Sequence, residues 1–154
     1  MADNRQIDQQ KVRDHIDSVL QGCEQVFEKF FLAKFMGLEF EYLPAGAADS
    51  EKTHLKITFE VSEMLMNPQG SLHGGVMAAV MDISMGHLLN KTAGMGATIE
   101  MKIQYLRPLR QGVVTCEGSF IKKGRSLSFM ESRLSGSDGK LAAIATATWK
   151  MPDA

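Results

Sequence analysis

Residues 67–90 have the sequence NPQGSLHGGVMAAVMDISMGHLLN. A loop that contains proline and glycine leads into a His-Gly-Gly triplet at His73, and an unbroken helical pattern of apolar residues then continues to Leu89. Apolar residues occupy every side of this predicted helix, which favours a buried core helix over an amphipathic surface helix. We therefore expect residues 73–90 to lie at the centre of the fold.

Asp82 is the only formally charged residue between Glu63 and Lys91, if histidines are taken as neutral. A carboxylate on a buried helix is costly unless it is paired, hydrogen-bonded or used in chemistry. One interpretation is a structural carboxylate that accepts hydrogen bonds from the backbone or from Ser84. The functional interpretation, which we favour, is a general base for a water molecule or a direct nucleophile.

Gly74 and Gly75 are predicted to open the helix. The first N–H groups of a helix have no partner within it, and the helix dipole makes that end positive. Because glycine has no side chain, a ligand oxygen can approach these N–H groups closely. His73, at the helix start, is able to cap the helix through its ring nitrogens. The alternative is that both glycines only permit close packing of the helix on a sheet.

Gly74 and Asp82 are eight residues apart, which corresponds to about 12 Å of rise along one helix. A reacting carbonyl has to lie roughly 3 Å from both its N–H donor and the attacking group. Two antiparallel copies of the helix, related by a two-fold axis, would bring Gly74 of one chain near Asp82 of the other. If both residues are catalytic, the sequence predicts an obligate dimer with composite sites.

The remaining segments predict one helix and six strands. The helical pattern covers residues 5–34, and Gly22 is a candidate break within it. Strand patterns cover 38–42, 55–61, 99–105, 113–121, 126–134 and 141–149. The first two are expected to form a hairpin, and the short connections of the last four predict a meander of antiparallel neighbours. Only the 73–90 helix is apolar enough to cover such a sheet, so the prediction is an α+β fold with the sheet curled around that helix.

Bulk properties exclude several classes of protein. A length of 154 residues fits one domain, and a net charge of −1 argues against a nucleic-acid-binding surface. No apolar run approaches the roughly 20 residues that span a bilayer, so no membrane insertion is expected. Cys23 and Cys116 are predicted to be buried free thiols, which fits a cytoplasmic location. Outside the His-Gly-Gly triplet, His15, His54 and His87 lack a second ligand at metal-binding spacing, so we expect no metal and no cofactor.

Taken together, these motifs resemble the hotdog-fold acyl-CoA thioesterases, specifically the phenylacetyl-CoA thioesterase branch. The resemblance covers roughly residues 31–151. It is carried by NPQG at 67–70, HGG at 73–75, Asp82, the 99–105 strand with RP at 107–108, and KGR at 123–125. It implies a hotdog domain over residues 35–154 behind an N-terminal helical extension over residues 1–34.

The resemblance also implies roles for individual residues. Asp82 would be the catalytic carboxylate, and the Gly74 N–H would polarise the thioester carbonyl. His73 and Asn67 would help to place the thioester or the water. Thr98 is the nearest match to a Ser or Thr that contacts the carboxylate from the strand after the helix. The family fold dimerises into one continuous sheet and commonly forms tetramers, which implies a homodimer that assembles into a homotetramer.

An acyl-CoA substrate calls for basic residues at the phosphates and an apolar pocket for the acyl group. Arg107, Lys123 and Arg125 are the basic candidates, and the alternative is that they are solvated turn charges. Met81 belongs to a group of methionines around the motif that either line the acyl pocket or fill the core. Two other functions stay open: a hydratase or dehydratase of acyl thioesters on the same fold, and a non-catalytic acyl-CoA-binding protein.

Overall fold

The computed structural model describes residues 7–45 and 54–151. Its helices are α1 (Gln9–Gly22), α2 (Phe31–Phe35), the short 3-10 helix η1 (Glu63–Leu65) and α3 (Gly74–Ala93). Its strands are β1 (Glu39–Leu43), β2 (His54–Glu60), β3 (Ala97–Tyr105), β4 (Val113–Lys122), β5 (Leu127–Ser135) and β6 (Leu141–Lys150). All six predicted strands are present, and their ends lie within two residues of the predicted ones.

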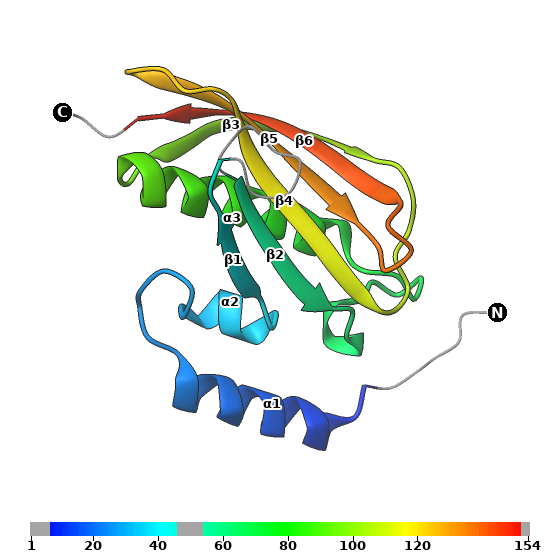
Figure 1. Cartoon of the computed structure of the whole chain (residues 1–154). Helices are drawn as coiled ribbons and strands as arrows, with labels where there is room; N and C mark the ends of the chain where they lie inside the picture. Colours follow the sequence, from blue (N-terminus) through cyan, green and yellow to red (C-terminus); the bar gives the residue numbers. More distant parts are fainter. Residues whose placement is uncertain (1–6, 46–53, 152–154) are drawn as a thin grey trace.

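The strands form one antiparallel sheet in the order β1-β2-β4-β5-β6-β3. Figure 1 shows the sheet curling over α3, which lies along its concave face. The predicted hairpin of β1 and β2 is confirmed, as are the hairpins that join β4 to β5 and β5 to β6. The predicted α+β architecture, a curved antiparallel sheet around a central helix, is therefore confirmed.

The predicted meander of four strands is wrong at its first step. β3 pairs with β6 and forms an edge of the sheet, whereas β4 lies between β2 and β5. Residues 106–112 carry the chain from β3 to β4 across the end of the sheet, and Leu109 is buried in this connection. The carbonyl of Leu109 accepts from the Leu72 N–H at 2.7 Å, and the carbonyl of Gly112 accepts from the Val61 N–H at 3.1 Å. These tertiary contacts override the hairpin that a short connection favours.

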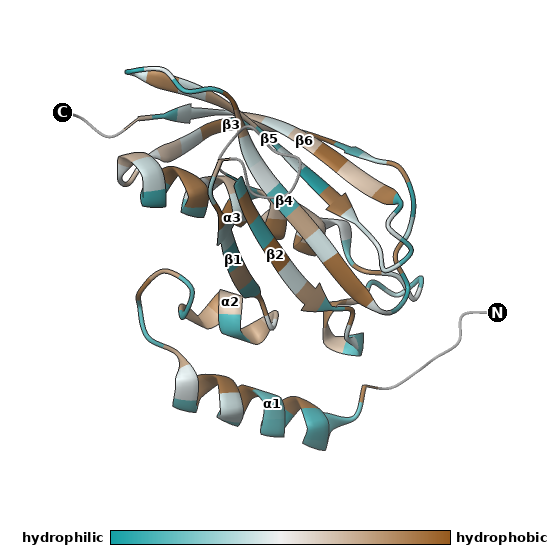
Figure 2. Ribbon diagram, viewed as in Figure 1, coloured by the Kyte–Doolittle hydropathy of each residue, from teal (hydrophilic) through white to brown (hydrophobic). Residues whose placement is uncertain are grey.

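α3 is apolar on all sides, as predicted, and its sheet side is the more completely buried one. Figure 2 shows the alternation of apolar and polar residues along the strands around it. The buried side chains of α3 are Met77, Val80, Met81, Ser84, Met85, His87, Leu88 and Leu89. α3 approaches the sheet closely at Gly118 of β4, where an added Cβ would lie 2.6 Å from the Ser84 carbonyl oxygen. Close packing on the sheet therefore needs Gly118, not the glycines that open α3.

The N-terminal region is not one continuous helix. α1 ends at Gly22, the predicted break, and residues 23–30 form an irregular segment before α2. Asp8 caps the start of α1, and the His15 ring contacts the Phe35 carbonyl oxygen at 2.8 Å. The predicted boundary between an N-terminal extension and the hotdog domain, between residues 34 and 35, stays a prediction. The helix α2 spans this boundary.

The two cysteines are free, as predicted, although only Cys116 is buried and Cys23 is half-buried. Burial raises the pKa of the Cys116 thiol to about 11. None of the helices in the described part of the chain is long and apolar enough to cross a membrane.

Candidate active site

The start of α3 presents one N–H group that is free to bind a ligand. His73 is the N-cap residue, as the sequence suggested, and its Nδ1 accepts a hydrogen bond from the Gly75 N–H at 2.9 Å. The His73 carbonyl accepts from the N–H groups of Val76 and Met77. Within residues 7–45 and 54–151 the Gly74 N–H has no acceptor. The capping arrangement thus satisfies its neighbours and leaves the Gly74 N–H available.

A hydrogen bond from a residue of β3 fixes the position of Gly74. The Tyr105 hydroxyl donates to the Gly74 carbonyl oxygen at 2.9 Å, which fixes the first turn of α3 against the C-terminal end of β3. The atoms nearest to a Cβ added at Gly74 would be those of the Tyr105 ring, at 3.5 Å, which is an ordinary contact. At Gly75 it would lie 3.0 Å from the capping nitrogen of His73. Gly75 therefore serves the cap, and packing alone does not account for Gly74.

Asn67 organises the loop that precedes the helix. Its Oδ1 accepts from the N–H groups of Gln69 at 3.0 Å and Ser71 at 3.3 Å, and its Nδ2 donates to the Ser71 hydroxyl at 3.2 Å. The Arg110 guanidinium donates to the carbonyl oxygens of Gln69 and Gly70, both at 3.3 Å. Sequence reasoning missed Arg110, because its partners are backbone carbonyls 40 residues earlier that carry no sequence signal.

Asp82 lies half-buried on the side of α3 that faces β3. The Thr98 hydroxyl donates to Asp82 Oδ1 at 2.8 Å, so the residue that the family resemblance suggested does contact the carboxylate. Burial raises the pKa of Asp82 above its ordinary value, and the hydrogen bond from Thr98 partly opposes this shift. Ser84 does not serve Asp82, because its hydroxyl bonds the Met81 carbonyl at 2.7 Å and the Ser132 hydroxyl at 2.9 Å.

A hollow of about 340 Å³ opens beside Asp82 and Thr98. Most of its other lining groups are apolar or small: Phe27, Ile83, Gly86, His87, Asn90, Met95, Gly96, Ala97 and Trp149. Gly86 lets the Trp149 ring approach the helix, since a Cβ there would lie 2.8 Å from the ring. A half-buried carboxylate at the rim of an apolar hollow is the arrangement expected of a site for an uncharged organic group.

The basic candidates fall at opposite ends of α3. Arg107 follows β3 near the start of the helix, where Tyr105 binds Gly74. Lys123 donates to the Thr92 carbonyl at 2.9 Å and so lies at the C-terminal end of α3, with Arg125 two residues further along the same turn. All three side chains are exposed. A single chain therefore does not gather them into one phosphate site.

Met81 does not line the site. Its side chain is fully buried in the core and is absent from the lining of the hollow beside Asp82. Of the two interpretations of Met81, burial favours core filling, because the turn of α3 at Met81 faces the sheet, one residue away from the side that carries Asp82.

Comparison with known proteins gives the family. Residues 69–143 match the Thioesterase superfamily model. PA1618 of Pseudomonas aeruginosa is 32% identical over 125 residues, which cover 79% of this chain and 81% of that protein. A solved variant of PA1618, described as a thioesterase, superposes with a TM-score of 0.70 at 23% identity and covers 97% of each chain.

Two further solved structures share the fold. BH2602 of Bacillus halodurans, solved with CoA, has a TM-score of 0.81 at 18% identity and covers 100% of this chain and 99% of its own. PaaI of Escherichia coli, from a phenylacetic acid degradation operon, has a TM-score of 0.73 at 17% identity and covers 90% and 96%. The chain therefore belongs to the thioesterase superfamily, has its hotdog fold and is a thioester hydrolase.

Proposed function

We propose that this protein hydrolyses acyl-CoA thioesters to the free carboxylic acid and coenzyme A, at a site made by two copies of the chain. The observation that carries the proposal is Asp82, held by Thr98 at the rim of an apolar hollow. The hollow would take the acyl group, and the carboxylate would act on the thioester carbonyl.

Asp82 has the environment that such a role requires. Among the described residues Thr98 is its only hydrogen-bond donor, and this bond uses Oδ1. The second oxygen is left to accept a proton from a water molecule as that water attacks the carbonyl carbon. The C–S bond then breaks, and the sulfur of coenzyme A leaves as the thiol by taking up the proton that Asp82 accepted. Direct attack by Asp82, which forms an acyl anhydride that water then hydrolyses, uses the same position.

The oxyanion donor would come from the second copy. Along α3, Gly74 lies beside Tyr105, and Asp82 lies beside Thr98, so both halves of the site lie along β3. β3 is an edge strand. If two copies of β3 paired antiparallel with Thr98 opposite the second copy's Tyr105, each Asp82 would lie near the second copy's Gly74. This pairing supports the composite site that helix rise alone suggested.

The surface along β3 has the composition of an interface. Met95 and Ile99 are 74% and 58% exposed, and Tyr105 and Leu106 are exposed as well. Exposed apolar residues beside an unpaired strand edge favour pairing with another chain. The predicted homodimer rests on this edge, and its assembly into a homotetramer stays a prediction, as does the cytoplasmic location.

Antiparallel copies would also assemble the phosphate contacts. Arg107 at the start of one α3 would come close to Lys123 and Arg125 at the end of the second copy's α3. Guanidinium and ammonium groups bind phosphates through charge-assisted hydrogen bonds. Coenzyme A would then lie across the dimer, with its thioester end near Asp82.

The test is an assay of thiol release over a panel of acyl-CoA substrates, with the products identified by mass spectrometry. We expect equal amounts of free acid and coenzyme A thiol. Formation of a double bond or hydration of one without thiol release would instead indicate the hydratase or dehydratase reaction. Tight binding of every acyl-CoA without any reaction would contradict hydrolysis and indicate a binding protein.

A further inference from the structure

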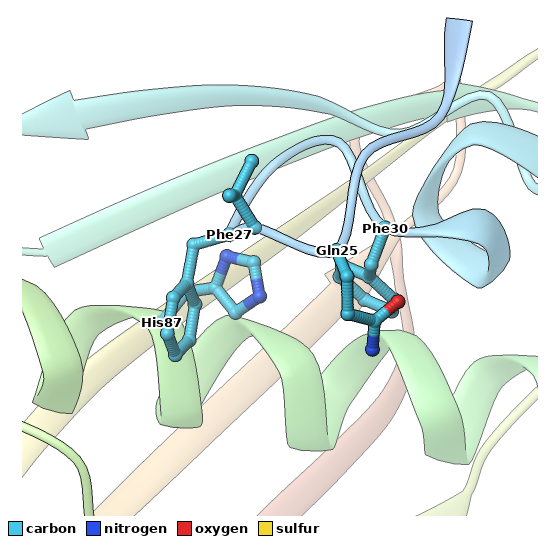
Figure 3. A pocket seen from close by; sticks show the side chains of 5 residues that line it. Gln25, Phe27, Phe30 and His87 are labelled. Carbon is cyan, nitrogen blue, oxygen red and sulfur yellow. The ribbon is translucent and has the colours of Figure 1, made fainter.

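A second hollow lies next to the one beside Asp82. It measures about 260 Å³ and lies between the irregular segment after α1 and the middle of α3. Figure 3 shows Gln25, Phe27 and Phe30 of that segment above His87 of α3. Phe27 and His87 line both hollows, so these two side chains stand between them.

The Phe27 and His87 side chains form a partition between the two hollows. His87 is the more buried of the two and is held by aromatic contacts. It is only 5% exposed, and the Phe40 ring stacks on it with centroids 4.8 Å apart and planes 9° from parallel. Phe30 contacts the same imidazole at 5.7 Å. Burial lowers the pKa of His87 to about 4, so the ring is neutral at pH 7. The partition therefore presents no charge to an apolar ligand.

Phe27, the second side chain of the partition, lies in the irregular segment between α1 and α2. Its ring meets His87 edge-on, with centroids 4.8 Å apart and planes at 73°, and it is 36% exposed. The segment is held in place by the Tyr42 hydroxyl, which donates to Glu28 Oε1 at 2.6 Å. Glu28 has a φ of 70°, a left-handed conformation that costs energy in a non-glycine residue. The segment next to Phe27 is thus anchored to β1 in one specific conformation.

We propose that the Phe27 ring, packed on His87, forms the end wall of the acyl-binding hollow and so sets the longest acyl chain that the enzyme accepts. The inference rests on the proposed function, since it assumes that the hollow beside Asp82 takes the acyl group. The substrates it assigns are uncharged acyl groups short enough to end at this ring. Removal of the ring would join the two hollows and let a longer chain continue over His87 toward Phe30.

The experiment measures kcat/KM for a series of straight-chain acyl-CoA substrates of increasing length. Phe27→Ala should move the optimum to longer chains, and the first substrate that the wild type rejects should gain about tenfold or more. Phe27→Trp should move the optimum toward shorter chains. Phe31→Ala is the matched control, because Phe31 is also exposed but lines neither hollow and stacks on Phe35. Its profile should equal that of the wild type.

Activity on the shortest substrate and the thermal unfolding temperature show whether each variant is folded. A folded Phe27→Ala enzyme with an unchanged chain-length profile would contradict the proposed role of Phe27 as the end of the acyl-binding hollow. It would leave the proposed hydrolysis untouched. Absence of thiol release from every acyl-CoA by the wild type would instead overturn the proposed function. The two failures are therefore distinguishable.

Discussion

The two sides of α3 differ in what their residues contact. On the sheet side, Met81 and Met85 are fully buried, and Ser84 bonds a serine of β5. On the side toward β3, the Gly74 N–H has no acceptor among the described residues, and half-buried Asp82 has one hydrogen-bond donor among them. The residues on the sheet side are packed or hydrogen-bonded within one chain, whereas the polar groups of Gly74 and Asp82 have room for further partners. The sheet side therefore maintains the fold, and under the proposed function the side toward β3 would bind substrate together with a second copy of the chain.

Loss of the carboxylate should have the largest effect on activity. Asp82→Asn keeps the size of the side chain but removes its ability to take a proton or to attack. We expect thiol release to fall about 10²–10⁴-fold. Stability should be unchanged or slightly higher, because the variant removes a carboxylate whose pKa burial raises. Thermal unfolding checks this, and near-normal turnover would refute the role of Asp82.

The Gly74 N–H can be removed without an obvious structural cost. Gly74 is the first residue of α3, where proline is well tolerated, and His73 already has the extended ψ of 132° that a following proline requires. We expect Gly74→Pro to lower kcat about 10²–10³-fold, as for loss of one oxyanion donor. Gly74→Ala is the control because it keeps the N–H, and it should retain most of the activity. Equal losses in both variants would mean that the effect is steric.

A substitution on the sheet side of α3 should lower stability and leave the catalytic rate unchanged. Met81→Ala leaves a cavity in the core, and we expect it to lower the free energy of unfolding by about 2–5 kcal/mol. Met81→Leu, which nearly conserves volume, should cost less. Chemical denaturation measures both. The folded fraction of Met81→Ala should keep its kcat. A selective loss of kcat would indicate that Met81 contributes to the active site.

The smallest effect is expected at Thr98. Native Asp82 holds its proton to higher pH than the unfolded chain does, so its contribution to stability falls as pH rises from the ordinary pKa through the raised one. For the same reason kcat/KM should decline in acid with an inflection above the ordinary aspartate pKa. Thr98→Val removes a hydrogen bond that lowers this pKa, so the inflection should move further up. An unmoved pH profile would contradict the Thr98 contact.

Much of this contrast could be predicted from the sequence because it depends on local patterns. The apolar run of α3, the alternation within each strand and the isolated charge of Asp82 predict elements and a site within one segment. The position of β3 at the sheet edge could not be predicted, because it depends on buried Leu109 and its backbone partners far away in the chain.

Two residues of the site region show the same limit. The apolar periodicity of α3 does not distinguish Met81, which faces the sheet, from its neighbour Asp82, which faces β3. Phe27 follows the helical pattern of the N-terminal region, yet it lies in an irregular segment anchored by Tyr42. Side-chain direction depends on which neighbours pack against an element, and one sequence does not contain that information.

The most direct test of the composite site is complementation between two inactive variants. Asp82→Asn and Gly74→Pro chains with different tags would be produced together, and the mixed dimers isolated through both tags. Each mixed dimer has one site with both groups intact, so it should recover about half of the wild-type activity. A mixed dimer no more active than the average of its two inactive parents would contradict the account.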